Sequence, residues 1–486
     1  MISIDKSYLD KASDTVPIFS KISVPLYWTA LVLTIVSLMY HQVVKPQWAY
    51  EEIFKINGFT LIIWATVLFF SATVGQYALN YLKGFQYQKQ FSLLSFGFTL
   101  SVMLLVMSNH VVLLLFSWLS MGFFMSRLIG IQQDWGEARA SMRFSFTHFI
   151  IGFMVLVAGI MILCFDSNQF TLSGLMNTTT YSRVSLFAAT LCIIIAAIIQ
   201  SALYPFHRWL LSAMTAPTPA SALMHAGFVN GSGILLTQFA PVLVLSQSLW
   251  ILFIIGGITA IVAQFHKLIQ VNVKHKLACS TIAQMGFMIM QCGLGFFNAA
   301  IAHLILHGFY KAYLFLSSGE QVNQSLPKEY PNLKINPLQS LTVGLFGISG
   351  AILFAYLTGK TNFNESSVFL TLIVAITVGQ ATYNIVKEKS LAIGQKIILS
   401  MSLFIIGITL YAIFFNGITQ VMQSMPFIQT PQPLHAVQII FGVIFFIGFF
   451  IMKLGWHQQF PWLYVKLLNL SQPYKNTIHY YKKLNS

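Results

Sequence analysis

Long apolar runs recur along the whole chain, and they constrain its fold more than any other feature of the sequence. Each run is about 17–24 residues long, enough for a helix to cross a hydrocarbon core about 30 Å thick. A segment in lipid must satisfy its backbone polar groups internally, so a helix is the expected structure. With 56% hydrophobic and 8% charged residues, the 486-residue chain is not a water-soluble domain. The pattern predicts an all-α polytopic membrane protein.

About fourteen such spans can be counted, and we expect them to form a single transmembrane domain over residues 24–453. A short N-terminal segment (1–23) precedes this domain, and a tail (454–486) follows it. The spans lie near 24–43, 59–82, 91–108, 111–128, 144–165, 184–204, 220–240, 249–266, 277–294, 299–316, 341–357, 368–386, 397–415 and 434–452.

Basic residues are distributed unevenly between the two faces that alternating spans define. One face holds both termini and 22 of the 27 Lys and Arg residues, whereas the other holds only Lys45, Lys55, Arg183 and Lys360. Lys311 lies inside a span. By the positive-inside rule, this asymmetry predicts that both termini are cytoplasmic. The charges are spread over the loops rather than gathered on one domain, so the net charge of +15 indicates no nucleic-acid partner.

The two ends of the chain and its cysteines carry weaker signals. Asp5, Asp10 and Asp14 precede the first span, which argues against a cleavable signal peptide. The segment 460–468 mixes aromatic residues with Lys466, which suits either an amphipathic helix at the membrane surface or a simple aromatic belt. The four cysteines have no paired spacing, and we expect buried reduced thiols: Cys164, Cys192, Cys279 and Cys292.

Proline interrupts one of the spans. Pro205, and then Pro217 and Pro219, each remove a backbone donor, so a regular helix cannot continue there. Such a break inside a membrane is tolerated where neighbouring groups or water satisfy the freed carbonyls, as in the discontinuous helices of transporters. A plain loop with helix-starting prolines is the alternative.

Titratable residues inside the spans are few, and they are histidines and lysine rather than carboxylates. All twelve acidic residues fall in loops or at span ends. His225, His303, His307 and Lys311 lie inside spans, and His148 and His266 lie nearer the ends of theirs. Because charge at membrane depth is costly, such residues mark pathways or partners.

His303, His307 and Lys311 follow one another at intervals of four residues, so on a helix they form one polar stripe. Side chains of this kind can accept and pass protons, which makes the stripe a candidate proton path. Two other interpretations exist. The histidines could bond to backbone carbonyls while Lys311 extends toward the cytoplasmic end. The His-x3-His spacing could also hold zinc, although no third ligand is evident.

Two longer blocks carry a resemblance to a known family. They are YPFHRWLLSAMTAPTPASALMHA at 204–226 and KHKLACSTIAQMGF at 274–287, and the polar stripe and FLSSG at 315–319 follow. These blocks resemble the proton-translocating antiporter-like subunits of respiratory complex I and of multisubunit sodium/proton antiporters, over roughly residues 110–320. The resemblance implies inverted five-helix repeats with broken helices in a core at about 110–415. It also implies an ion path through His225, Lys274, His303, His307 and Lys311.

Three departures from the family pattern bear on mechanism. Leu119 follows Trp118 where pumping subunits carry a glutamate, and Gln200 replaces a lysine before the signature proline. Residues 345–350 hold no lysine where the later broken helix should have one. The usual glutamate–lysine switch therefore cannot operate, and Gln200 and Asn230 remain as possible polar way-points.

The shortened pattern and the variant MHAGFVNG at 224–231 resemble the membrane subunits of Dab inorganic-carbon accumulation systems. This resemblance implies a subunit in the plasma membrane of a prokaryote that conducts H⁺ or Na⁺ and drives CO₂ hydration to bicarbonate by a large cytoplasmic partner similar to a β-carbonic anhydrase. Zinc would belong to that partner, with no cofactor or catalytic site in this chain. Two alternatives remain: a subunit of complex I or of a sodium/proton antiporter, and a non-conducting membrane anchor for a soluble enzyme.

Overall fold

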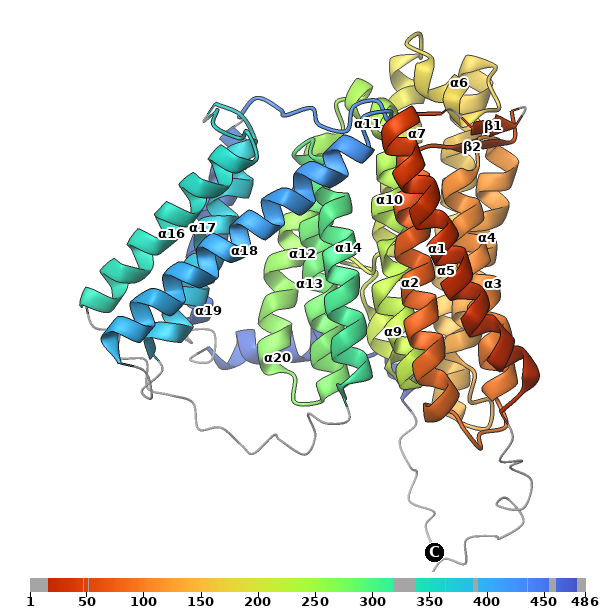
Figure 1. Cartoon of the computed structure of the whole chain (residues 1–486), viewed down its shortest axis with the longest axis horizontal. Coiled ribbons are helices and arrows are strands. Elements are labelled where there is room, and N and C mark those ends of the chain that lie inside the picture. Colours follow the sequence, from red (N-terminus) through yellow and green to blue (C-terminus); the bar gives the residue numbers. More distant parts are fainter. Residues whose placement is uncertain are drawn as a thin grey trace, which may run out of the picture.

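The computed structural model describes residues 16–46, 48–50, 52–318, 337–362, 364–387, 392–434, 436–453 and 460–478. Most of the expected N-terminal segment (1–15) and parts of the tail (454–459 and 479–486) lie outside the described residues. The same holds for the loop 319–336. Within the described part, the chain is almost entirely helical, with one small antiparallel hairpin (Figure 1).

The helices and strands follow one another along the chain with short connections. The hairpin pairs β1 (Trp48–Tyr50) with β2 (Phe54–Ile56). The helices are α1 (Ile18–Val44), α2 (Gly58–Tyr81), α3 (Gln88–Met107), α4 (Val111–Ile129), α5 (Gly136–Ser167), α6 (Leu172–Asn177), α7 (Arg183–Gln200), α8 (Arg208–Ser212), η2 (Ala213–Thr215), α9 (Thr218–Ala226), η3 (Phe228–Asn230), α10 (Gly231–Gln238), α11 (Ala240–Leu245), α12 (Leu249–Ile269), α13 (Val273–Gly293), α14 (Phe297–Leu316), α16 (Pro337–Leu357), α17 (Ser367–Lys387), α18 (Ile393–Val421), α19 (Ala436–Lys453), α20 (Pro461–Leu470) and η5 (Lys475–Thr477).

The predicted all-α membrane architecture is confirmed. Nine of the helices in the described ranges are at least 18 residues long and apolar enough to cross a membrane. Each of the fourteen expected spans coincides with a helix, or with the half-helix pair α9 and α10. The chain is therefore a multi-pass membrane protein.

The helices form two groups that meet along α12, α13 and α14 (Figure 1). The first group contains α1 to α11, and the second contains α16 to α19. Helix α18 packs on α14, and α19 packs on α12, so these central helices connect both groups. In Figure 1, β1, β2 and the α16–α17 connection lie at the upper end of the bundle, and α20 and the α12–α13 connection lie at the lower end.

Glycines bring α12 and α13 into direct backbone contact. A Cβ atom on Gly286 would lie 2.7 Å from the carbonyl oxygen of Gly256, and a Cβ on Gly256 would lie 2.6 Å from the carbonyl oxygen of Gly286. Small residues at a helix crossing allow this approach, which is how membrane helices associate when lipid is as apolar as the side chains. The contact between Gly256 and Gly286 fixes the position of α13, which packs against α14 and its titratable stripe.

The proline-rich segment connects two spans, as the alternative of a loop with helix-starting prolines predicts: α7 is a complete span, and Pro219 lies in the first turn of α9. Helix α7 ends at Gln200, Ala202 adopts a left-handed backbone conformation (φ 54°), and short α8 and η2 lead to α9. Neighbouring groups satisfy the freed backbone: the Trp209 indole donates to the carbonyl of Ile199 (2.8 Å), and the Ser201 hydroxyl donates to the carbonyl of Val229 (2.6 Å). These two hydrogen bonds fasten the segment after α7 to the end of α7 and to η3.

A second interruption was not predicted. The span expected at 220–240 divides into α9 and α10, with Gly227 and η3 between them. In the second half of the chain, α16 runs unbroken from Pro337 to Leu357, and the chain turns only at Gly359 (φ 69°). The clear backbone interruptions of the described spans thus lie in the first half.

Candidate functional site: a row of buried histidines and lysines

The stripe predicted on α14 is present, with His307 and Lys311 buried and His303 half-buried. The rings of His303 and His307 are nearly parallel (13°), with centroids 5.9 Å apart. Lys311 is fully buried, and its ammonium group donates a hydrogen bond to the carbonyl oxygen of Leu277 on α13 (3.0 Å). Lys311 therefore points into the protein, toward the beginning of α13.

His225 on α9 faces this stripe. Its ring stacks on that of Phe315 on α14, with centroids 4.3 Å apart, and it lies within electrostatic range of Lys311 and Lys274. The approach of the two helices depends on Gly308, because a Cβ atom there would lie 3.1 Å from the carbonyl oxygen of Ala226. The interruption after α9 thus places His225 beside His307 and Lys311.

The histidine nitrogens of this row lack protein partners. In the described ranges, both ring nitrogens of His225 and of His307 are buried without a hydrogen bond, as is Nε2 of His303. Buried polar groups are normally paired with protein or with water. The interpretation in which these histidines bond to backbone carbonyls therefore does not hold for these nitrogens, and the row is a place where water or a proton can bind.

Lys274 lies at the start of α13, at the lower end of the row. Asn272 caps this helix by accepting hydrogen bonds from the backbone amides of Lys274 and His275 (2.9 and 3.3 Å). The Lys274 ammonium donates to the carbonyl of Ala216 (2.9 Å), which belongs to the broken segment. Lys274 therefore links α13 to the break.

The two proposed way-points support the α9–α10 interruption. The Gln200 amide donates to the carbonyl of Phe228 (3.2 Å), and the Asn230 amide donates to the carbonyl of Ala226 (2.7 Å). The Asn230 side-chain oxygen is buried and unpartnered within the described chain. Their donors satisfy carbonyls at the interruption, and the Asn230 oxygen stays available for water.

Lys360 is a further buried lysine, which the sequence analysis assigned to an outer loop. It lies in the connection between α16 and α17, outside the spanning helices, yet it is only 5% exposed. Its ammonium group contacts the rings of Phe415, Phe296 and Phe354 at 3.8, 5.4 and 5.7 Å from their centroids, and it has no hydrogen-bond partner in the described ranges. Burial lowers the pKa of Lys360 to about 7.

A cavity of about 340 Å³ connects this lysine with the α14 stripe. Its walls are mainly apolar residues of α13, α14, α16, α17 and α18. Among its polar lining residues are Lys360, His303, Gln291 and Tyr411, and the Gln291 side-chain oxygen is buried without a partner among the described residues. The row of polar groups therefore continues from His303 toward the upper end of the bundle. The family pattern predicts a lysine in the later broken helix, at residues 345–350. Lys360 lies outside that segment, in the connection after α16.

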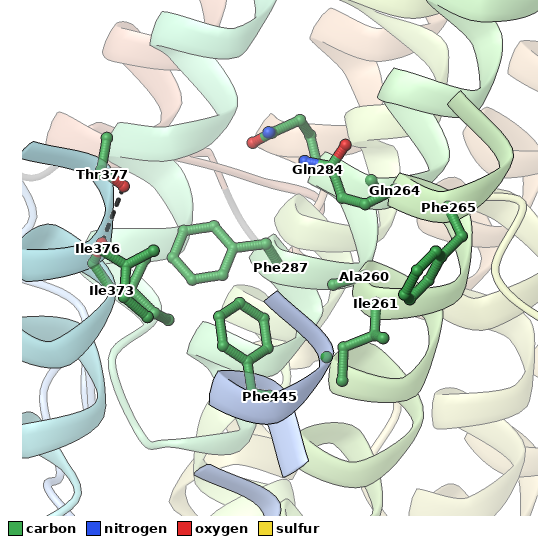
Figure 2. A pocket seen from close by; sticks show the side chains of 12 residues that line it. Ala260, Ile261, Gln264, Phe265, Gln284, Phe287, Ile373, Ile376, Thr377 and Phe445 are labelled. Carbon is green, nitrogen blue, oxygen red and sulfur yellow. Dashed lines mark hydrogen bonds between the residues drawn. The ribbon is translucent and has the colours of Figure 1, made fainter. Parts of the chain in front are cut away.

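A second cavity of about 300 Å³ lies against the same helices (Figure 2). Figure 2 shows Phe287 at its centre, Gln264 and Gln284 on one side, and Phe445 of α19 opposite. Phe287 lines both cavities and packs edge-on against His303 (centroids 5.2 Å apart). Its ring therefore separates the polar row from this apolar pocket.

The cysteine, histidine and carboxylate side chains of the described residues form neither a metal-binding cluster nor a disulfide. No group of three or more His, Cys, Asp or Glu side chains could hold a metal ion there. All four cysteines are free: Cys164, Cys192, Cys279 and Cys292.

Residues 108–385, more than half of the chain, match the family described as NADH:quinone oxidoreductase/Mrp antiporter, transmembrane. The chain belongs to this antiporter-like family of membrane subunits. Its curated relatives include proteins named "Probable inorganic carbon transporter subunit DabB" from Bacillus anthracis (33% identical over 65% of this chain and 62% of the relative) and Hydrogenovibrio crunogenus (28% over 84% and 78%). The resemblance to Dab membrane subunits within the antiporter-like superfamily is confirmed.

Other members of the family are similar at greater distance. NADH-ubiquinone oxidoreductase chain 5 of Acanthamoeba castellanii is 31% identical over 63% of this chain and 48% of that protein. The Mrp complex structure from Dietzia sp. aligns with 90% of this chain and 54% of its own chain, at a TM-score of 0.62 and 18% identity. The second similarity concerns the fold alone. The chain spans less than two thirds of the length of several relatives, including that from Bacillus anthracis.

Proposed function

We propose that this chain is the cation-conducting membrane subunit of an inorganic carbon transporter. The names of the Dab relatives support the transported substrate class. The buried row that joins Lys274, His225, Lys311, His307 and His303 supports the conducting role. In this proposal the row continues to Lys360 at the upper end, and cations flow from that end toward the cytoplasm.

The unpartnered histidine nitrogens carry this proposal. Five such nitrogens line the row in the described part of the chain, and a neutral imidazole can take up a proton on one nitrogen and release it from the other. An apolar helix core gains nothing from these five unpartnered imidazole nitrogens, because each unpaired buried polar group costs about 1–3 kcal/mol. Water molecules bound to these nitrogens would remove that cost, and they would connect the side chains of the row so that protons can pass.

The second half of the proposal concerns a partner. We propose that a large cytoplasmic subunit similar to a β-carbonic anhydrase binds the chain and holds the zinc that hydrates CO₂, and that this chain contributes no catalytic site. In this division of labour, this chain conducts the cations and its partner hydrates CO₂. Co-purification of a zinc-containing subunit with the tagged chain tests the pairing, and its absence from a functional preparation contradicts it.

The first prediction concerns the α14 stripe. We expect the double variant His303→Ala, His307→Ala to lose complementation of a carbonic-anhydrase-deficient strain at ambient CO₂, because it removes the relay from the middle of the row. The matched control is His41→Ala on α1, which removes a buried histidine outside the row. Undiminished growth of the double variant, at wild-type protein levels, would contradict a conducting role.

A non-conducting anchor and an antiporter subunit are distinguished by two further measurements. Proton uptake into vesicles that contain the chain and its partner supports conduction, and an anchor shows none. Co-purification with hydrophilic NADH-oxidising or small antiporter subunits would favour the antiporter alternative, which the family match supports. Leu119 and Gln200 stand where that alternative needs charged residues.

A further inference from the structure

A second cluster of titratable residues lies outside the row, at the lower end of the bundle. The Tyr204 hydroxyl and Nδ1 of His266 form a hydrogen bond of 2.5 Å. The Tyr204 ring also packs against that of His207, with centroids 3.8 Å apart and the ring planes tilted by 32°. His266 is fully buried and His207 nearly so. Tyr204 and His207 belong to the broken segment, and His266 belongs to the last turn of α12.

The tail of the chain covers this cluster. Nε2 of His207 is hydrogen-bonded to the carbonyl oxygen of Leu470 at the end of α20 (2.8 Å) and therefore carries a proton. Nδ1 of His207 is buried without a partner among the described residues. His207 thus has one site satisfied by the tail and one site open to a proton or a water molecule.

Several contacts hold the tail on the broken segment. The Gln270 amide donates to the carbonyl oxygen of Ser471 (2.9 Å), and the backbone amide of Tyr474 donates to the hydroxyl of Ser212 (3.1 Å). The Thr477 hydroxyl donates to the same Ser212 oxygen (3.0 Å). The Tyr474 ring stacks in parallel on Phe144 of α5, with centroids 4.4 Å apart. These contacts close the cluster from the lower end.

Cys279 of α13 lies between this cluster and the row. Its thiol is within electrostatic range of both Tyr204 and Lys311. Arg208 is the other charged neighbour of Tyr204 and His207. The cluster therefore faces the lower end of the row on one side and the tail on the other.

We infer that Tyr204, His266 and His207 form a proton-exchange site between the buried row and the cytoplasm, which the segment 461–477 covers and uncovers. This inference rests on the proposed conduction of cations. A hydroxyl hydrogen-bonded to an imidazole passes a proton along that bond. In this inference a water molecule carries the proton on to the open Nδ1 of His207, and His207 releases the proton of Nε2 when the Leu470 carbonyl moves away. A purely structural cluster would only fasten the tail.

The first arm of the test removes a single oxygen atom. We expect Tyr204→Phe, in vesicles that contain the chain with its partner, to lower proton uptake at least about tenfold, the order of effect of a lost proton-transfer group. The ring and its packing against His207 remain, so the variant should melt close to the wild type. Tyr474→Phe is the matched control, because the contacts of Tyr474 use its ring and its backbone amide.

The second arm fixes the tail reversibly. The hydroxyls of Ser212 and Thr477 are 3.0 Å apart, so the pair Ser212→Cys, Thr477→Cys is suitably placed for a disulfide. We expect oxidation to stop proton uptake and reduction to restore it, whereas the two single variants respond to neither. Mass spectrometry confirms the bond.

The outcomes separate this inference from the proposed function. If wild-type vesicles take up neither protons nor sodium ions, the proposed function fails. If they take up sodium ions but no protons, the exchange site alone is overturned. If they take up protons while Tyr204→Phe matches the wild type, the exchange site is overturned. If the confirmed disulfide leaves uptake unchanged, the tail does not control access to the cluster, and that part is overturned.

Discussion

A few individual side chains decide whether the interior of this helix bundle can pass a proton. The four-residue spacing of His303, His307 and Lys311 placed them on one face of a helix, and the structure buries His307 and Lys311 and half-buries His303. Lys360 was missed for a physical reason. A lysine in a short loop normally stays in water, and only the tertiary contact with Phe296, Phe354 and Phe415 removes it from solvent.

Lys360 should make stability depend on pH. Its pKa is about 7 in the folded protein, below the ordinary value of 10.5, so the unfolded chain binds the proton more tightly. Stability therefore rises as the pH increases from about 7 toward 10.5, and the benefit is absent below pH 7. We expect the melting temperature of the wild type to rise across pH 7–9 relative to that of Lys360→Met.

Thermal melting in detergent, followed by tryptophan fluorescence, measures this difference. Lys55→Met, which removes an exposed lysine at the same end of the bundle, is the control and should parallel the wild type. Parallel curves for the wild type and Lys360→Met would show that the buried amine does not titrate in this range.

At the scale of helices, the sequence predicted the end of a helix where a proline removes a backbone donor. It did not predict an interruption that depends on contacts between distant segments. Proline predicted the break after α7 because it removes backbone donors. The α9–α10 interruption contains no proline, and Gly227 alone does not distinguish a break from a close helix contact. In the folded chain, Phe98 and the carbonyl oxygen of Leu223 lie against Gly227. The sequence alone does not show these contacts.

The close contact of α12 and α13 predicts a strong effect of a small change. In Gly286→Ala, the new methyl group would lie 2.7 Å from the Gly256 oxygen and 2.8 Å from the Ala260 nitrogen, which are backbone atoms that cannot rotate away. We expect a loss of roughly 1–3 kcal/mol in stability from overpacking. Gly417→Ala on α18 meets no atom within 4 Å and should be neutral or mildly stabilising.

Unfolding in detergent with increasing denaturant measures both variants. The proton uptake of Gly286→Ala should fall as well, since α13 carries Lys274 and the carbonyl that holds Lys311. A Gly286→Ala variant as stable as Gly417→Ala would contradict direct backbone contact between the two helices.

The whole molecule has an orientation that the distribution of lysine and arginine predicts. The α12–α13 connection should face the cytoplasm, and the β1–β2 hairpin should face outward. Val271→Cys and Tyr50→Cys test this, because both positions are exposed. In intact cells, a membrane-impermeant maleimide should label only Tyr50→Cys, and permeabilised cells should show both. Labelling of Val271→Cys in intact cells would reverse the assigned orientation.

The number and order of spans followed from hydropathy because lipid permits few alternatives to a helix. The packing of the two helix groups on α12, α13 and α14 could not be predicted from hydropathy, because it depends on contacts between segments far apart in sequence. The second cavity in Figure 2 arises from this packing, between α12, α13, α17 and α19.

The buried row also bears on the choice of coupling ion. The charged side chains buried in the described part of the chain are lysines, with no aspartate or glutamate among them. A dehydrated sodium ion needs several oxygen atoms to replace its water shell, whereas imidazole and amine nitrogens repel it once protonated. A proton needs only one lone pair at a time. We therefore expect the coupling current to respond to a pH difference and to be indifferent to replacement of sodium by choline.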